Sequence, residues 1–240
     1  MEKELIIITG ASSGIGMETA KQFSKMGHPL LLLARRTEPM QALSLPDAIC
    51  TSVDVTDREA LKEAVQSAES KYGPAGAIIN NAGVMLLGNI ISQDPQEWDT
   101  MFDVNVKGLL NGIHAVAETM VKQKKGTIIN ISSIAGIKSF PNHVAYVGTK
   151  FAVSGLSENL REEMAPHNVR VITIEPGAVD TTLLTHTTDE TIKKDYNLWK
   201  EEMGGVLSVQ DVANAIVYAY SQPQNVCIRE IVIAATKQIN

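Results

Sequence analysis

Tyr146 and Lys150 stand four positions apart in a stretch whose apolar residues recur at helical spacing. Four residues make about one helical turn, so the two side chains are expected on one face, with Cβ atoms roughly 5 to 6 Å apart. A phenol ordinarily has a pKa of about 10 and is a poor base at neutral pH. A cation about 4 Å away stabilises the phenolate by about 4 kcal/mol at an effective dielectric of about 20. The pair therefore predicts a general acid and base whose pKa is lowered toward neutrality.

The same spacing has a simpler interpretation, in which Tyr146 is a core residue and Lys150 its solvated neighbour. For an isolated pair this is the commoner meaning. Ser133 favours chemistry, because it follows residues 127–131, whose apolar pattern is typical of a buried strand. The carboxyl end of a parallel strand is where side chains reach a site, so Ser133 is expected close to the pair.

A glycine-rich loop, TGASSGIG at residues 9–16, separates a strand pattern from a helix pattern near the N-terminus. Residues 5–8 are a short β-branched run, and residues 15–26 have helical apolar spacing. Glycine lets the backbone approach a phosphate, and the amides and dipole of a helix N-terminus favour negative charge. An ordinary strand-to-helix corner needs only one glycine. Three glycines with Ser12 and Ser13 instead predict dinucleotide binding.

Two arginines follow the second predicted strand, which covers residues 30–34. An enzyme that uses NAD places an acidic residue there to bond the ribose 2′-hydroxyl. Guanidinium groups match a phosphate instead, so Arg35 and Arg36 predict recognition of the 2′-phosphate of NADP(H). The other interpretation is a pair of solvated surface arginines.

Five motifs, in this order, resemble those of the short-chain dehydrogenase/reductases: TGxxxGIG at 9–16, NNAG at 80–83, Asn105, Ser133 and YxxxK at 146–150. The glycine spacing is the variant of that family, and the resemblance covers nearly the whole chain. It implies a single α/β domain over residues 1–240 with a Rossmann fold. This fold is a doubly wound parallel sheet of about seven strands, with helices on both faces. It also implies transfer of a hydride between NADP(H) and an alcohol or carbonyl group.

The resemblance assigns catalytic roles to Asn105, Ser133, Tyr146 and Lys150. In it, Asn105 holds a water that relays protons to Lys150, Ser133 is the oxyanion partner, and Lys150 also holds the nicotinamide ribose. With Tyr146 and Lys150, the implied cofactor contacts are Gly10, Ser12, Ser13, Gly14, Ile15, Gly16, Arg35, Arg36, Asp54, Val55, Asn81, Ala82, Gly83, Pro176, Gly177, Val179 and Thr181.

Ser13 departs from the family pattern, and Asp54 has a second possible role. NADP users of the family often carry a basic residue where this chain has Ser13, which leaves the cofactor preference to the arginine pair. Asp54 is implied to meet the adenine amino group, but an aspartate here can also cap the helix expected to begin near Asp57.

Residues 96–121 predict a long helix in which Asn105, Gly108 and Gly112 are weak helix formers. Asn111 matches no motif and is interpreted as structural. Apolar residues lie on more than one face of this helix and of the Tyr146 helix, which indicates packing against another subunit. The resemblance implies a homo-oligomer, a tetramer or a dimer.

Residues 181–205 form the longest stretch without a regular pattern and are predicted to be a mobile substrate lid. An exposed amphipathic helix is a compatible alternative. The candidate pocket residues are Val84, Met85, Ile134, His143, Leu183 and Trp199. Residues 172–177, 207–212 and 229–233 resemble the branch of NADP-dependent 3-hydroxy acid (serine-type) dehydrogenases. No arginine lies in 181–205 to meet a carboxylate, so a small alcohol or carbonyl compound is the general expectation.

Composition narrows the remaining possibilities. A formal net charge of −6 disfavours a nucleic-acid partner, and residues 5–8 are too short an apolar run for a signal peptide or a membrane span. The two cysteines suggest buried thiols in a reducing, cytoplasmic location. The histidines have no metal-ligand spacing, so no metal is expected. A GxSxG elbow does not accompany Ser133, so a hydrolase triad is disfavoured.

Two other functions account for part of this pattern. A catalytically silent NADP-binding sensor or scaffold would keep the glycine loop, but it would not need Asn105, Ser133, Tyr146 and Lys150 together. A sugar-nucleotide epimerase or dehydratase of the longer branch of the superfamily needs a further substrate domain, for which 240 residues leave no room.

Overall fold

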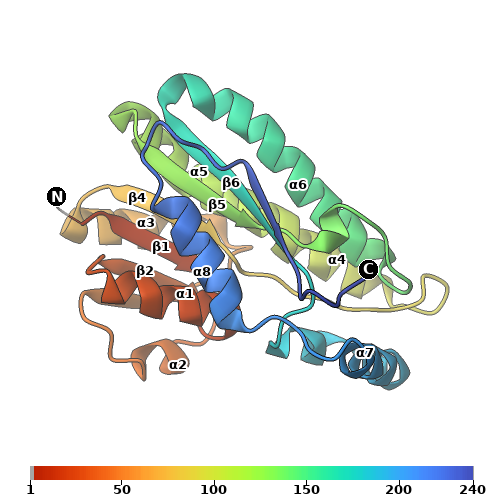
Figure 1. Ribbon diagram of the computed structural model, residues 1–240. Coiled ribbons are helices and arrows are strands. Elements are labelled where there is room, and N and C mark those ends of the chain that lie inside the picture. The colour runs from red at the N-terminus through yellow and green to blue at the C-terminus, as the bar shows by residue number, and fades with distance from the viewer. Residues whose placement is uncertain (1–2, 240) are drawn as a thin grey trace.

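Short runs of leucine and β-branched residues form the strands of a parallel sheet in the computed structural model, which describes residues 3–239 (Figure 1). The sheet has seven strands: β1 (Leu5–Thr9), β2 (Leu30–Ala34), β3 (Ala48–Ser52), β4 (Ala75–Asn80), β5 (Gly126–Ile131), β6 (Val169–Pro176) and β7 (Glu230–Ile233). Their order is β3-β2-β1-β4-β5-β6-β7, and every neighbouring pair is parallel. The order reverses beside β1, where doubly wound sheets bind ligands. The predicted Rossmann fold is confirmed.

Helices cover both faces of the sheet, and alternate strand residues point to each face. Ile6 and Ile8 of β1 belong to the core under α1 (Gly14–Lys25) and α8 (Val209–Tyr220). Figure 1 shows α8 crossing in front of the sheet, with α1 beside it. The opposite face packs against α3 (Arg58–Tyr72), α5 (Gly108–Gln123) and α6 (Val144–Met164). A short helix, α2 (Glu38–Gln41), links β2 to β3. Because both faces are buried, the central strands are almost continuously apolar.

The long helix predicted over residues 96–121 is present, with one irregular turn. It consists of α4 (Pro95–Phe102), a π-helical turn (Asp103–Lys107) and α5. Asp94 caps it by accepting a hydrogen bond from the Gln96 amide at 3.0 Å. Asn105 lies in the π-helical turn, where the regular hydrogen-bond pattern changes. Asn111 is buried and donates to the Val55 carbonyl at 2.9 Å, which supports its structural interpretation.

The prediction of an irregular segment at residues 181–205 is wrong. The chain there forms a 3₁₀ turn (Thr182–His186) and α7 (Glu190–Glu202), as in the helical alternative. Asp189 caps α7 by accepting from the amides of Thr191 and Ile192. The helix has no fully buried residue, so its apolar period is diluted by polar side chains. In Figure 1, α7 lies apart from the sheet, at the lower right.

The exposure of two kinds of side chain bears on the predictions of buried thiols and of packing against another subunit. Both cysteines are free, but Cys227 is exposed, because it precedes the edge strand β7, and the prediction of a buried thiol is wrong there. Exposed apolar side chains occur on α4, α5 and α6 at Phe102, Leu110, Val144 and Phe151.

Among residues 3–239, no helix is long and apolar enough to cross a bilayer. The same residues contain no cluster of three or more His, Cys, Asp or Glu side chains arranged to hold a metal ion.

Candidate active site

The carboxyl ends of the strands border one cavity of about 640 Å³. Most of the residues predicted for the site line it: Gly10, Ser12, Ser13, Gly14, Ile15, Arg35, Arg36, Asp54, Val55, Asn81, Ala82, Gly83, Ser133, Tyr146, Lys150, Pro176, Gly177, Val179 and Thr181. Gly16 and Asn105 do not. The six predicted pocket residues, Val84, Met85, Ile134, His143, Leu183 and Trp199, also line the cavity.

The glycine loop is fixed to the end of β4. The Thr9 hydroxyl accepts hydrogen bonds from the amides of Asn81 and Ala82, both at 3.0 Å. Gly10 has φ +65°, and a Cβ there would lie 2.8 Å from the Ala82 Cα, so only glycine fits. A Cβ on Gly16 would lie 2.5 Å from the Gly10 carbonyl oxygen. Gly16 therefore packs the loop rather than facing the cavity.

The N-terminus of α1 is open to an anion. Its N-cap residue, Ser13, makes no side-chain capping bond, and the first turn contains no acidic residue. The amides of this turn and the positive end of the helix dipole are therefore available to a phosphate. Arg35 and Arg36, both exposed, border the same cavity beyond the end of β2.

Asp54 and Asp57 have separate roles. The Asp54 carboxylate accepts from the Thr56 amide at 2.9 Å and from its hydroxyl at 2.8 Å. The N-cap of α3 is Asp57, which accepts from the Ala60 amide at 3.0 Å. The capping alternative for Asp54 is therefore wrong, and its position on the cavity leaves the predicted adenine contact as its proposed role.

Ser133, Tyr146 and Lys150 line the same cavity as the glycine loop and lie close to one another. The Lys150 Nζ is 5.7 Å from the centre of the Tyr146 ring and donates to the Ile131 carbonyl at 3.0 Å. The Ser133 hydroxyl donates to the Pro176 carbonyl at 3.4 Å and accepts from the Ala135 amide at 3.1 Å. One strand end and one helical turn thus bring two hydroxyls and an amine to one place.

Burial dominates the electrostatics of this group. Desolvation raises the pKa of Tyr146 above its ordinary value, nearby Tyr196 raises it further, and a hydrogen bond with Ser133 lowers it. Desolvation also lowers the pKa of Lys150 to about 8. The net shift is opposite to the lowering predicted from the Lys150 spacing, because the loss of water around the buried phenol outweighs the hydrogen bond with Ser133. Tyr146 is therefore protonated at neutral pH and suited to donate a proton.

Asn105 is buried and does not line the cavity, although the preceding residue, Val104, does. Its side-chain oxygen accepts from the Val84 amide at 2.8 Å, and its nitrogen donates to the Val84 carbonyl at 2.9 Å. The same nitrogen donates to the Thr149 hydroxyl at 3.1 Å. The side chain therefore holds the chain after β4 against α6.

Sequence reasoning missed a polar support under Lys150. The Ser132 hydroxyl donates to the Lys150 carbonyl at 3.2 Å and lies 2.9 Å from the Ser154 hydroxyl. Ser154 in turn donates to the Glu175 carboxyl at 2.6 Å. Glu175 is 1% exposed, and burial, followed by the nearby Glu230, raises its pKa to about 7. The strand pattern of β6 gave no indication that one of its side chains is a buried acid.

Other cavity residues were also missed. Tyr196 lies three positions before the predicted pocket residue Trp199 on α7 and shares a face with it, a signal that was available once the helix was recognised. Phe140 comes from the loop before α6. Gln238 lies near the C-terminal end, and its side-chain oxygen accepts from the Ala178 amide at 3.0 Å. No sequence motif indicated that the chain folds back here over the Pro176 turn.

Comparisons with known proteins agree with this arrangement. The sequence pattern of the short chain dehydrogenase family matches residues 4–192. An uncharacterized oxidoreductase of Listeria monocytogenes is 38% identical over 99% of this chain and 98% of its own length. Glycine betaine reductase of Emericella nidulans is 36% identical over 96% of this chain, which spans only 18% of that protein. The closed form of serine dehydrogenase complexed with NADP+ has a TM-score of 0.89 and 29% identity, covering 98% of this chain and 96% of the other.

The family match over residues 4–192 includes the loop, the strand ends and the helix that border the cavity, and the similarity to the Listeria protein and to serine dehydrogenase extends over nearly the full chain. The chain belongs to the short chain dehydrogenase family, in a branch similar to the serine dehydrogenases, and is an oxidoreductase of CH–OH and C=O groups.

Proposed function

We propose that the protein transfers a hydride between NADP(H) and a small alcohol or carbonyl compound, with Tyr146 as general acid and base. The observation that carries this proposal is that Ser133, Tyr146 and Lys150 line one cavity together with the glycine loop and the arginine pair. Tyr146 also belongs to an apolar cluster, several of whose residues line the same cavity. A reacting carbon beside Tyr146 would therefore share one cavity with both a cofactor and a proton donor.

The residues present fit a 2′-phosphorylated dinucleotide. Gly10 permits close backbone approach, the uncapped N-terminus of α1 suits a pyrophosphate, and Arg35 and Arg36 suit a further phosphate. The cofactor, when bound, supplies or accepts the hydride. The contacts proposed from the family resemblance for Asp54, Val55, Pro176, Gly177, Val179 and Thr181 all face the same cavity.

The protein's own part is to hold and move a proton. In reduction, the Ser133 and Tyr146 hydroxyls hold the carbonyl oxygen, and Tyr146 donates its proton as negative charge develops there. In oxidation, the Tyr146 phenolate removes the hydroxyl proton. Lys150, with a pKa lowered to about 8, exchanges its own proton close to neutral pH. We propose that it passes protons between Tyr146 and water held at the π-helical turn of Asn105.

Two structural roles complete the proposal. Residues 181–205 act as the substrate lid, and buried Thr187 anchors this segment, since its hydroxyl donates to the Met85 carbonyl and accepts from the Leu87 amide, both at 3.1 Å. The exposed apolar residues of α4, α5 and α6 are the surface on which a homo-oligomer, a tetramer or dimer, would form. A catalytically silent sensor would not need Ser133, Tyr146 and Lys150 gathered at one point.

Cofactor titration tests the proposal. NADPH and NADH are titrated separately against wild type and an Arg35→Ala/Arg36→Ala double variant, with Arg229→Ala as a control, since Arg229 is exposed on another edge. We expect NADPH to bind at least about tenfold more tightly than NADH, which is about 1.4 kcal/mol, and the double variant alone to lose that margin. Equal binding of the two would make the arginines surface residues. Binding of NADPH without turnover of any carbonyl compound would favour the sensor.

A further inference from the structure

Four rings line the cavity beyond Ser133 and Tyr146 and form what we term the aromatic row: Phe140, His143, Tyr196 and Trp199. Neighbouring ring centres are close: 5.6 Å for Phe140–His143, 6.2 Å for His143–Tyr196 and 5.2 Å for Tyr196–Trp199. His143 is also 6.2 Å from the Tyr146 ring. Two of these rings come from the loop before α6 and two from α7, so the row spans the body of the protein and the lid.

The aromatic row carries no charge at neutral pH. His143 Nδ1 is hydrogen-bonded to the Pro141 carbonyl, which can only accept, so Nδ1 bears the hydrogen. Burial lowers the pKa of His143 and therefore keeps the ring neutral. Burial raises the pKa of Tyr196 to about 12, so its hydroxyl remains protonated.

The walls around the aromatic row are also neutral. They include Met85, Leu87, Ala135 and Leu184, which are buried, and Val84, Leu183 and Ile192, which are partly buried. Among the described residues of α7, the charged side chains that border the cavity are Asp195 and Lys200. Asp195 is exposed, and the Lys200 Nζ lies 5.7 Å from the centre of the Tyr196 ring. Outside α7, the exposed Lys138 has its Nζ 5.5 Å from the centre of the Phe140 ring. These three charged side chains are exposed or partly exposed, whereas the side chains packed around the row are apolar.

We infer, resting on the proposed function, that the substrate is an uncharged alcohol or carbonyl compound whose reacting carbon carries a flat aryl or conjugated group. Tyr196 and Trp199 are its specificity-determining residues. A flat ring gains edge and stacking contacts with the aromatic row beyond those of a saturated group of equal size.

Charged substrates fit this end poorly. In serine, both charged groups are bonded to the carbon next to the one that reacts, so they would lie among neutral side chains, and an unpaired buried charge is costly. A quaternary ammonium group, as in the glycine betaine named for the Emericella nidulans relative, would gain attraction from the rings but meet the Lys200 charge over Tyr196. The names of the two relatives therefore do not predict this chain's substrate.

Oxidation with NADP+ tests the inference on four alcohols: 1-phenylethanol, 1-cyclohexylethanol, serine and choline. The first two differ only in whether the ring is flat. We expect kcat/KM for 1-phenylethanol to exceed that for 1-cyclohexylethanol by about tenfold, since each ring contact is worth about 2- to 10-fold. Tyr196→Leu and Trp199→Ala should each reduce this ratio to about 1–3. Tyr196→Phe, which keeps the ring, should preserve it.

The outcomes separate the inference from the proposed function. A ratio near 1 in wild type, or a higher kcat/KM for serine or choline, would overturn the inference while leaving the oxidoreductase intact. A serine activity lost in Lys200→Ala and Asp195→Asn would show that these charges recognise the substrate. If no alcohol is oxidised, the proposed function fails. Quenching of Trp199 fluorescence in a Trp98→Phe background, by acetophenone but not by cyclohexyl methyl ketone, would then still support the aryl subsite, and equal quenching would overturn it.

Discussion

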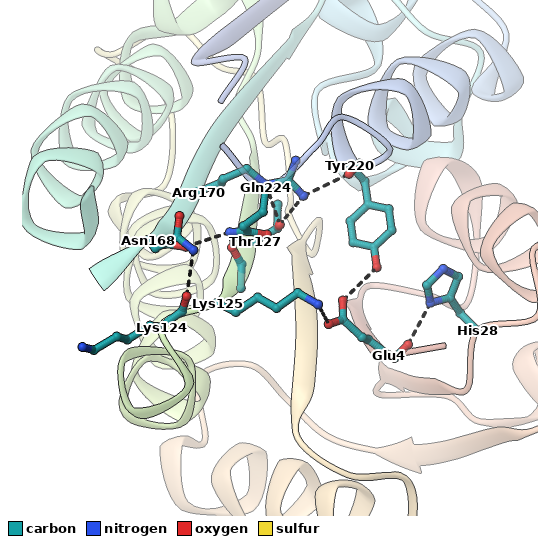
Figure 2. Close-up of polar contacts among 10 residues, drawn as sticks. Glu4, His28, Lys124, Lys125, Thr127, Asn168, Arg170, Tyr220 and Gln224 are labelled. Carbon is teal, nitrogen blue, oxygen red and sulfur yellow. Dashed lines mark hydrogen bonds and ion pairs between the residues drawn. The ribbon is translucent and has the colours of Figure 1, made fainter. Parts of the chain in front are cut away.

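The two ends of the parallel sheet hold polar side chains in opposite ways. At the amino end, Arg170 is only 6% exposed, and its guanidinium donates to the Thr127 hydroxyl and to the carbonyls of Tyr220 and Gln222 (Figure 2). At the carboxyl end, the Lys150 amine is about equally buried, yet within residues 3–239 it donates to one protein acceptor, the Ile131 carbonyl. The Arg170 guanidinium is thus hydrogen-bonded by the protein itself, whereas the Lys150 amine has further N–H donors that a bound molecule could use.

Figure 2 shows how the amino end joins segments distant in sequence. Glu4, before β1, forms an ion pair with Lys125 at 2.5 Å and accepts from the Tyr220 hydroxyl at 3.4 Å. The Glu4 carbonyl is 2.8 Å from His28 Nδ1. Burial lowers the pKa of Arg170 and raises that of Tyr220, as it shifts Lys150 and Tyr146 at the other end. Desolvation thus acts at both ends, and what differs is whether hydrogen bonds from the protein compensate for it.

Removal of one hydroxyl at each end gives the largest contrast. Tyr146→Phe is expected to reduce kcat by about 10³-fold or more, because the proton donor is lost, while NADPH binding and unfolding free energy stay near wild type. Tyr220→Phe is the matched control and should leave turnover unchanged, since Tyr220 contacts Glu4 far from the cavity. Steady-state kinetics and NADPH titration measure both. Normal turnover in Tyr146→Phe would exclude its role as acid and base.

Removal of the buried guanidinium should have the opposite result. Arg170→Met leaves the Thr127 hydroxyl and the carbonyls of Tyr220 and Gln222 without their donor, so we expect a loss of about 3 kcal/mol in unfolding free energy. Specific activity per folded molecule should not change. Arg36→Met, at the exposed carboxyl end, is the comparison and should alter stability by less than about 0.5 kcal/mol. Urea unfolding decides between them, and equal stability of the two variants would refute the contrast.

Glu175 offers a smaller, pH-dependent effect beneath the site. Its folded pKa of about 7 lies above the ordinary 4.5, so the folded state holds this proton more tightly than the unfolded state. The resulting stability is fully present below about pH 4.5 and is lost as pH rises through about 7, by at most about 1.4 kcal/mol per pH unit. Urea unfolding at pH 5, 6 and 7 should show this component in wild type and not in Glu175→Gln.

The Glu230→Gln variant tests the cause of the raised Glu175 pKa. Removing the neighbouring carboxylate removes one cause of the raised pKa, so the loss of stability should move to lower pH. The Glu175→Gln variant is not expected to lose turnover, because the amide still accepts from the Ser154 hydroxyl. Identical pH dependence in wild type and Glu175→Gln would show that this acid is not the titrating group.

Local features of the chain were predictable because they depend on neighbouring residues. The apolar runs of the strands, the glycine loop and the one-turn spacing of Tyr146 and Lys150 are all properties of short windows. The capping box of Ser208 and Asp211, which begins α8, is also a local feature, because its two residues are three positions apart. Family resemblance then supplied a doubly wound parallel sheet of about seven strands, and the carboxyl ends of parallel strands are where side chains reach a site.

Only the tertiary structure brought Tyr196 of α7 to His143 and Gln238 to the Pro176 turn, because these contacts join segments that no local pattern relates. It also decided the protonation of the site. Spacing alone predicted a phenol acidified by Lys150, whereas packing buries both groups and raises the Tyr146 pKa. Spacing determines which groups are neighbours. The loss of water around them depends on every element that covers the site, so their charge state follows from the fold.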